Sequence, residues 1–290
     1  MATGITTTGA LSDSLPIIID SARIVREQPG VMTKCVDRVT LPEGTGLSWD
    51  EISLAKLTAQ NITENTIFDN PQQLSDTLLT ITPTVTAVST IITDRTMARI
   101  SKNVAGQIGK LAQNAIERKK DEDGITVLDG ATTALCGTGT TLTSGHIAAA
   151  SNRIQGNTTE PSTSPIFSVL HPFQIKDIQD EVVAGVGTYT VPTGLTEEYF
   201  RNGFSGSLYN TNVMADGNIP ITANDAKGGV FAREGIILVQ GHGVRTETKR
   251  LPERGGGADQ LFIFDEYAYG ERSAGNWLYE IYSDATAPTS

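Results

Sequence analysis

Residues 94–121 (DRTMARISKNVAGQIGKLAQNAIERKKD) most constrain the fold, because they predict a single long α-helix. Apolar side chains recur along this stretch at steps of three and four, which places them on one helical face. The helix spans about 39 Å at 1.5 Å per residue, whereas helices in globular domains average about 11–12 residues. Other elements must therefore pack along it. The apolar positions are Met97, Ile100, Val104, Ile108, Leu111 and Ala115, and a second stripe of small residues holds Ala98, Ala105, Gly109 and Ala112.

The ends of this helix carry sequence signals as well. Asp94 is predicted as the N-cap, because its side chain can accept the free N–H groups of the first turn. The basic run 118–120 suits the C-terminal end of the helix dipole, and Gly124 is predicted to end the helix. The acidic residues 121–123 are then expected in solvent, since they do not match a calcium-binding loop.

The segments before the helix are extended. Residues 1–30 are polar and rich in Thr, Gly and Ser, which predicts an arm that is either a frayed tail or a strap over a neighbouring subunit. Residues 31–78 lack helical periodicity and indicate a functional loop or an extended hairpin, in which Trp49 is either a local packing plug or an anchor between subunits. Residues 79–91 alternate as a strand, and Pro83 predicts an edge position or a break.

After the helix, a mixed pattern of strands and helices follows. Residues 131–144 read as a linker and 146–154 as a helix closed by Gly156. A strand at 166–170 leads into His171, Pro172 and a helix over 173–183, with proline at the first helical position. Strands are expected over 204–214, 235–241 and 244–251, then a glycine-rich turn at 254–258 and a final hairpin of 261–269 with 276–282.

Composition excludes several classes of function. The net charge of −11 gives no electrostatic footprint for wrapping nucleic acid. No apolar run reaches the length of a membrane span, so no membrane partner is expected, and the N-terminus lacks the pattern of a secretory signal. Cys35 and Cys136 lack metal-ligand spacing, which favours unpaired thiols in a reducing compartment over a disulfide or a metal site.

No catalytic constellation emerges from the sequence. His146, His171 and His242 share no metal-ligand spacing, and His171 is expected to cap the helix that follows it. Residues 106–110 lack the spacing of a phosphate-binding loop and lie inside the predicted helix. We therefore predict no catalytic, cofactor-binding or metal-binding residue, no cofactor and no enzymatic activity.

The order of these elements resembles the Hong Kong 97-like fold of tailed-bacteriophage major capsid proteins. The resemblance covers residues 31–281 and rests on the arm, the long loop before a strand, the single long helix, and the strand with His171-Pro172 that precedes a helix. It implies an α+β fold with an N-terminal arm (1–35), an extended hairpin loop (36–78), a peripheral domain (79–125 and 241–290, with a spine helix over 94–121) and an axial domain (126–240).

The resemblance also implies the function. The chain would assemble with itself as pentamers and hexamers into an icosahedral shell, part of the virion, that encloses double-stranded DNA without binding it tightly. Assembly would take place in the host cytoplasm, with scaffolding, portal and decoration proteins as further partners. An encapsulin-type bacterial nanocompartment shell is the alternative with the same fold, and an α/β enzyme with a remote active site is the third interpretation.

Overall fold

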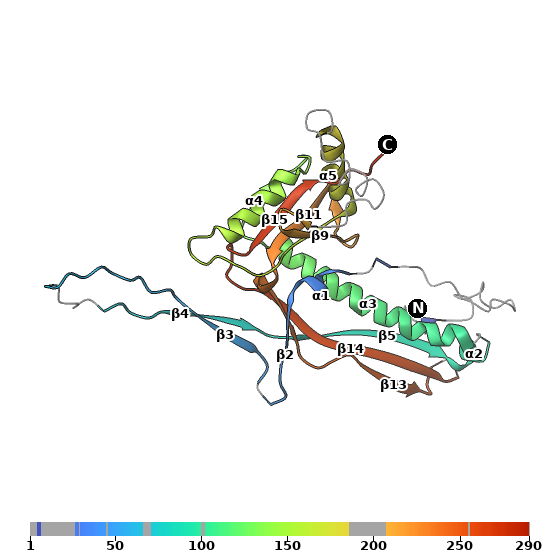
Figure 1. Cartoon of the computed structure of the whole chain (residues 1–290). Coiled ribbons are helices and arrows are strands. Elements are labelled where there is room, and N and C mark those ends of the chain that lie inside the picture. The colour runs from blue at the N-terminus through green and yellow to red at the C-terminus, as the bar shows by residue number, and fades with distance from the viewer. Residues whose placement is uncertain are drawn as a thin grey trace.

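The computed structural model describes residues 5–6, 27–28, 30–44, 46–65, 71–99, 102–185, 207–254 and 256–289. Within these residues the chain forms two β-sheets and a separate two-stranded hairpin, arranged along the long helix α3 (Lys102–Asp129). Figure 1 shows α3 lying over the first sheet, with the second sheet at one end of the helix and the hairpin projecting away from both.

The first sheet has the strand order β1-β5-β14-β12-β2, and β13 pairs with β14 beside it. The first part of β14 pairs with β5 and β13, and its end pairs with β12. One face of the sheet is covered by α3, where Ala112 and Ile116 pack against Val88 and Ile263. Burial of this apolar face against a helix gives the sheet its core. The strands are β1 (Ile5–Thr6), β2 (Asp37–Thr40), β5 (Thr84–Thr93), β12 (Ile236–Gln240), β13 (Arg245–Leu251) and β14 (Ala258–Glu271).

The second sheet has the strand order β6-β15-β11-β7-β9-β8, and β10 pairs with β11. Helices α4 (Ser144–Gln155) and α5 (Pro172–Gly185) lie on it (Figure 1). Ile147, Ile154 and Ile178 from these helices are fully buried against Val230 of β11. The strands are β6 (Ala134–Cys136), β7 (Ile166–Leu170), β8 (Ser207–Leu208), β9 (Thr211–Ala215), β10 (Ile221–Thr222), β11 (Asp225–Ala232) and β15 (Leu278–Asp284).

The two sheets meet in the largest core cluster. Leu128 of α3 is buried there with Phe231 of β11, Leu238 of β12 and Met32 of a short helix, α1 (Met32–Cys35). The chain passes from the second sheet to the first through a 3-10 helix, η2 (Arg233–Gly235), and returns through residues 272–277. Consequently β12 lies in the first sheet and β15 in the second. The domain division expected from sequence grouped residues 236–240 with the axial domain and 278–284 with the peripheral domain.

The predicted ends of the long helix are wrong. A separate turn, α2 (Asp94–Met97), precedes α3, and its N-cap is Thr93, whose hydroxyl accepts the N–H of Thr96 at 3.3 Å. Asp94 instead forms an ion pair with Arg250 of β13. At the other end α3 continues through Gly124 to Asp129, so the basic run 118–120 lies mid-helix.

Gly124 does not end the helix because its missing side chain makes room for packing. A Cβ there would lie 2.9 Å from Cβ of Met32 and 3.2 Å from Cζ of Tyr269. The buried face is also shifted from the predicted one, since Leu111 is exposed whereas Ala112 and Ile116 are buried. Asp121, expected in solvent, has no exposed surface.

Other predicted elements have mixed outcomes. The break at Pro83 is confirmed, since β4 (Asp76–Ile81) ends before it and β5 begins after it. The strand–helix unit of β7 and α5 is also confirmed. The predicted final hairpin is wrong, because β14 and β15 belong to different sheets. Residues 207–215 form the short hairpin β8–β9, whereas a single strand was expected, and β6 lies within the expected linker. Most of the predicted arm, and residues 204–206, lie outside the described residues.

Candidate assembly interface

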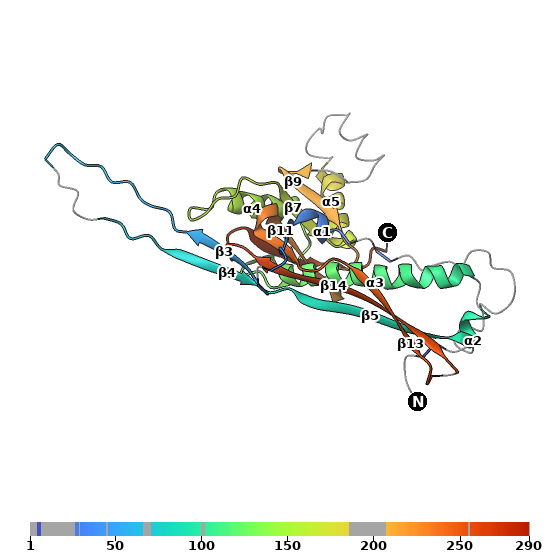
Figure 2. The same ribbon diagram turned by 90° about the horizontal axis from the view of Figure 1, so that it is seen from below.

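The hairpin of β3 (Trp49–Leu54) and β4 projects well beyond both sheets, and its extended arms continue past the strands (Figures 1 and 2). Six residues of each strand pair antiparallel, from Trp49 opposite Ile81 to Leu54 opposite Asp76. An isolated two-stranded hairpin is marginally stable in water. Its position therefore depends on contacts at its root and on whatever covers its length.

Two sets of contacts fix the root. Trp49, Leu79 and Ile81 face inward and pack against Val39 and Ile237 of the first sheet. The guanidinium of Arg272, just after β14, donates to Asp37 of β2 at 2.7 Å and to Glu51 of β3 at 2.8 Å. Trp49 thus lies in a local cluster, as the packing-plug interpretation requires. Charge-assisted hydrogen bonds of this kind fix the orientation of the hairpin as well as its position, because the planar guanidinium sets the direction of both bonds.

Beyond the strands, side chains continue the pairing of the two arms. The N–H of Ala55 donates to the carbonyl of Ser75 at 2.9 Å. The amide of Gln72 then replaces a strand partner: its oxygen accepts the N–H of Thr58 at 2.8 Å, and its nitrogen donates to the carbonyl of the same residue. Lys56 donates to the carbonyl of Thr158 in the loop after α4, at 2.5 Å. The arms are therefore held together for some distance along an exposed path.

The hairpin loop carries exposed apolar side chains, some of them on its outward side. Ile52 and Leu78 are opposite each other in the register, on the face turned away from the first sheet, and Leu54 shares that face. Large hydrophobic side chains exposed to this degree over one segment mark an interaction surface, because a free chain gains nothing by leaving them in water. Among the described residues of 47–65 and 71–78, seven such side chains, each 60–82% exposed, are Leu47, Ile52, Leu54, Leu57, Ile62, Leu74 and Leu78.

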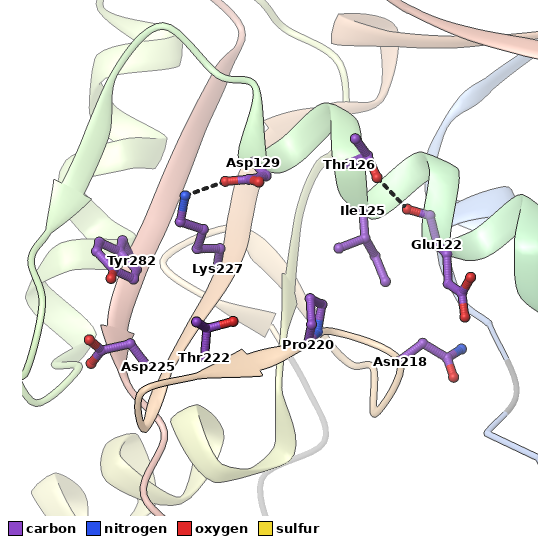
Figure 3. Close-up of a pocket in the computed structure, with 10 residues that line it drawn as sticks. All are labelled: Glu122, Ile125, Thr126, Asp129, Asn218, Pro220, Thr222, Asp225, Lys227 and Tyr282. Atoms are coloured by element: carbon purple, nitrogen blue, oxygen red, sulfur yellow. Dashed lines mark hydrogen bonds and ion pairs between the residues drawn. The ribbon is translucent and has the colours of Figure 1, made fainter.

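A hollow of about 500 Å³ lies between the end of α3 and the second sheet (Figure 3). Carboxylates of Glu122, Asp129 and Asp225 line it, and Lys227 is the one cation among its ten lining residues. The ammonium of Lys227 is already paired with Asp129, and Glu280 lies 3.6 Å away. The amine of Lys227 is therefore held as a paired ammonium and is not a free nucleophile in this hollow.

The histidines and cysteines serve local roles. Nδ1 of His171 accepts the N–H of Phe173 at 3.2 Å, which confirms the predicted cap, and burial lowers its pKa. His146 completes a capping box at the start of α4, and His242 lies 3.3 Å from Glu266 on the surface. Cys35 and Cys136 are both free thiols.

The part of the chain that the structure describes has no cluster of three or more His, Cys, Asp or Glu side chains suited to a metal ion. None of its helices is long and apolar enough to cross a membrane.

Solved phage capsids share this architecture. The sequence matches no protein-family model and no curated protein. The capsid structure of cyanophage P-SCSP1u is 11% identical, with a TM-score of 0.71, over 97% of this chain and 96% of that chain. The capsid of Ralstonia phage GP4 is 12% identical, with a TM-score of 0.71, over 98% and 100%. This chain has the phage capsid fold. A structure from Mycobacterium phage Che8 agrees at 13% identity and a TM-score of 0.70, over 91% and 95%.

The α+β capsid fold predicted from the order of elements is therefore confirmed. In this capsid fold α3 is the long helix, and β3 and β4 form a projecting hairpin whose strands pair from Trp49 opposite Ile81 to Leu54 opposite Asp76. Sequence reasoning missed Arg272 at the hairpin root. No sequence signal marked it, because its partners Asp37 and Glu51 lie more than 220 residues away.

Proposed function

We propose that the chain is the major capsid protein of a tailed bacteriophage, which assembles as pentamers and hexamers into an icosahedral shell around double-stranded DNA. The observation that carries the proposal is the projecting hairpin, whose seven exposed hydrophobic side chains have no cover within the described chain. A capsid fold gives this surface a use: it would lie over the neighbouring copy. Because the hairpin and the surface that receives it differ, the contact would be heterologous, and such a contact forms closed rings when the rotation between copies closes.

The rigid and the extended parts of the chain would have different roles in the shell. Pentamers and hexamers require slightly different contacts from one sequence. The unchanging part would be α3 on the first sheet, the peripheral domain, with β12 included. The second sheet, with α4, α5 and β15, would form the axial domain and meet its copies at ring centres. The hairpin loop and the N-terminal arm would adapt to the two ring sizes.

The net charge of −11 supports a container that encloses DNA without gripping it. Neutralising phosphates requires basic groups, and a protein that does so loses affinity steeply with salt. Assembled shells are expected to bind DNA weakly even at low salt, and strong, salt-dependent binding would contradict this. We expect no enzymatic activity. The protein would be part of the virion and would assemble in the host cytoplasm. Scaffolding, portal and decoration proteins are proposed as partners.

The experiment is removal of the hairpin arms. Residues 55–75 are replaced by Asn-Gly, which favours a tight turn between β3 and β4. The variant should keep a folded core yet form no shells by electron microscopy and light scattering. A milder variant, Leu57→Ser with Ile62→Ser and Leu74→Ser, should weaken assembly, whereas Ala59→Ser with Gln60→Ser and Asn61→Ser in the same arm should assemble normally. Shells that form equally well from all variants would refute the role of the hairpin. Cargo protein in place of nucleic acid inside native shells would favour the encapsulin alternative.

A further inference from the structure

Two carboxyl groups are buried together where three parts of the chain meet. Asp121 on α3 and Asp216 in the loop after β9 have no exposed surface. One oxygen of Asp121 accepts the N–H of Met32 at 3.0 Å, so it holds residues 30–36, the root of the N-terminal arm. Gly30 in the same segment packs directly on Asp121, since a Cβ there would lie 2.5 Å from its Cγ.

Asn218 joins the two carboxyls. Its side-chain amide donates to the second oxygen of Asp121 at 2.9 Å, and its backbone N–H donates to Asp216 at 2.9 Å. The backbone N–H of Asp216 donates to the carbonyl of Leu170 at the end of β7, also at 2.9 Å. The pair therefore links the root of the arm, the long helix and the second sheet.

Neither carboxyl forms an ion pair with a lysine or arginine of the described chain. Oδ2 of Asp216 is buried without a donor among the described residues, and Asn218 holds the two carboxyls next to each other. Two adjacent carboxylates cannot both ionise in an apolar site. A single proton on Oδ2 of Asp216, donated in a hydrogen bond to Asp121, gives this oxygen a partner. It also leaves the pair with one negative charge instead of two. Burial and then the Asp121 carboxyl raise the pKa of Asp216 to about 7.

The groups around the pair do not neutralise it. From α1, the buried thiol of Cys35 faces both carboxyls, and from β14 the phenol of Tyr269 faces Asp121. The pKa of each is raised by its own burial first, so both stay neutral in this range. The charges that act on these two groups are Lys34 and Arg233 on Cys35, and Arg38 and Asp123 on Tyr269. Glu117 and Lys120 line the hollow next to Asp121.

We propose that Asp121 and Asp216 form a proton-sharing lock that fastens the root of the N-terminal arm to the long helix and the second sheet, and that release of the proton to solvent loosens this junction. On release the O–H bond of Asp216 breaks, its electron pair stays on oxygen, and two carboxylates are left side by side. In the proposed shell this would couple the position of the arm to pH. The lock is a property of the single chain, so its failure would leave the capsid proposal standing.

The direction follows from linkage. The folded junction holds a proton that the opened junction, with ordinary carboxyls, has already lost at neutral pH. Opening is therefore suppressed most below about pH 4 and becomes up to tenfold easier per pH unit as the pH rises towards 7, above which it levels off. Between pH 5 and pH 7 the expected change is up to about 100-fold.

Hydrogen exchange of residues 30–36 in the unassembled full chain tests the lock. After correction for intrinsic exchange, the wild-type opening should rise steeply from pH 5 to pH 7. In Asp216→Asn the amide can donate to Asp121 at every pH, so the opening should be independent of pH. Asp177→Asn is the matched control: burial raises the pKa of Asp177 too, but it lies on α5 and accepts the N–H of Leu142, so this variant should behave as wild type.

Opening of residues 30–36 that is flat in the wild type, or that keeps its slope in Asp216→Asn, would overturn the proposal. If Asp216→Asn does not fold, infrared spectroscopy of the wild type decides. A buried protonated carboxyl should give a carbonyl band at pH 6 that disappears by pH 8.5. Absence of the band at pH 6 would refute the shared proton.

Discussion

Two glycines of α3 provide a sharp test of how the helix is packed. Gly109 and Gly124 lie in the same helix, but a Cβ at Gly109 would meet nothing within 4 Å. A Cβ at Gly124 would lie 2.9 Å from Cβ of Met32, 3.1 Å from its Cγ and 3.2 Å from Cζ of Tyr269. The substitutions Gly109→Ala and Gly124→Ala therefore add the same methyl group to an open site and to a filled one.

The difference between the two variants isolates the steric cost. In each variant the free energy of unfolding rises by about 1 kcal/mol from helix propensity, because alanine is more favourable than glycine in a helix interior. This contribution cancels when the two variants are compared. Overpacking a filled site costs about 1–3 kcal/mol. Met32 is fully buried, so it cannot swing into solvent to relieve the contact. Gly109→Ala should thus be stabilised by about 1 kcal/mol, and Gly124→Ala should be less stable than it by about 1–3 kcal/mol.

Urea unfolding of the unassembled protein, followed by far-ultraviolet circular dichroism, measures this difference directly. Equal unfolding midpoints for the two alanine variants would refute the reasoning. They would mean that α1 does not pack on α3 at Gly124, or that the helix ends before that residue.

Three further predictions concern single side chains. Arg272→Ala should expose the hairpin root to proteolysis and cost about 1–2 kcal/mol, because charge-assisted bonds to partners such as Glu51 are lost; an unchanged cleavage rate would contradict it. Gln174→Met keeps volume but removes buried bonds to β11 and β15, so urea unfolding should show a loss of about 1–3 kcal/mol, and a neutral result would argue against the network. Burial raises the pKa of both thiols, that of Cys35 to about 11, but Cys35 has no exposed surface whereas Cys136 is half-buried. At pH 8 a thiol reagent should therefore label Cys136 in the native state and Cys35 only after unfolding; rapid native labelling of Cys35 would contradict its burial.

Several local signals predicted local structure correctly, although the N-cap of the long helix was wrongly assigned to Asp94. Pro83 breaks the strand because it cannot donate a ladder hydrogen bond, and Pro172 begins α5 because its fixed φ suits the first helical turn. His171 caps that helix as expected. In the same turn, the side-chain oxygen of Gln174 accepts the backbone N–H of His171 at 3.0 Å. These features depend on residues within a few positions of one another, so the sequence displays them.

Features that depend on distant partners could not be predicted. Gly124 looks like a helix end, yet its role is to admit Met32, which lies far away in the chain. Asp121 looks like a solvated helix residue, yet Met32 and Asn218, 89 and 97 residues away, bury it. The separation of β14 from β15 is set by which sheet each strand joins, and a turn-like sequence between two strands does not specify this. The candidate interface was predicted in part. The sequence indicated an extended hairpin or loop in residues 31–78, but it did not indicate the contacts of Arg272 that hold the hairpin at its root.

The central claim is that this chain builds a closed shell. Cryo-electron microscopy of the purified, assembled protein tests it most directly. We expect icosahedral particles with pentamers and hexamers, in which the β3–β4 hairpin of each copy lies on its neighbour and nucleic acid fills native particles. Monomers or small closed oligomers under every assembly condition, with the hairpin free in solution, would contradict the account.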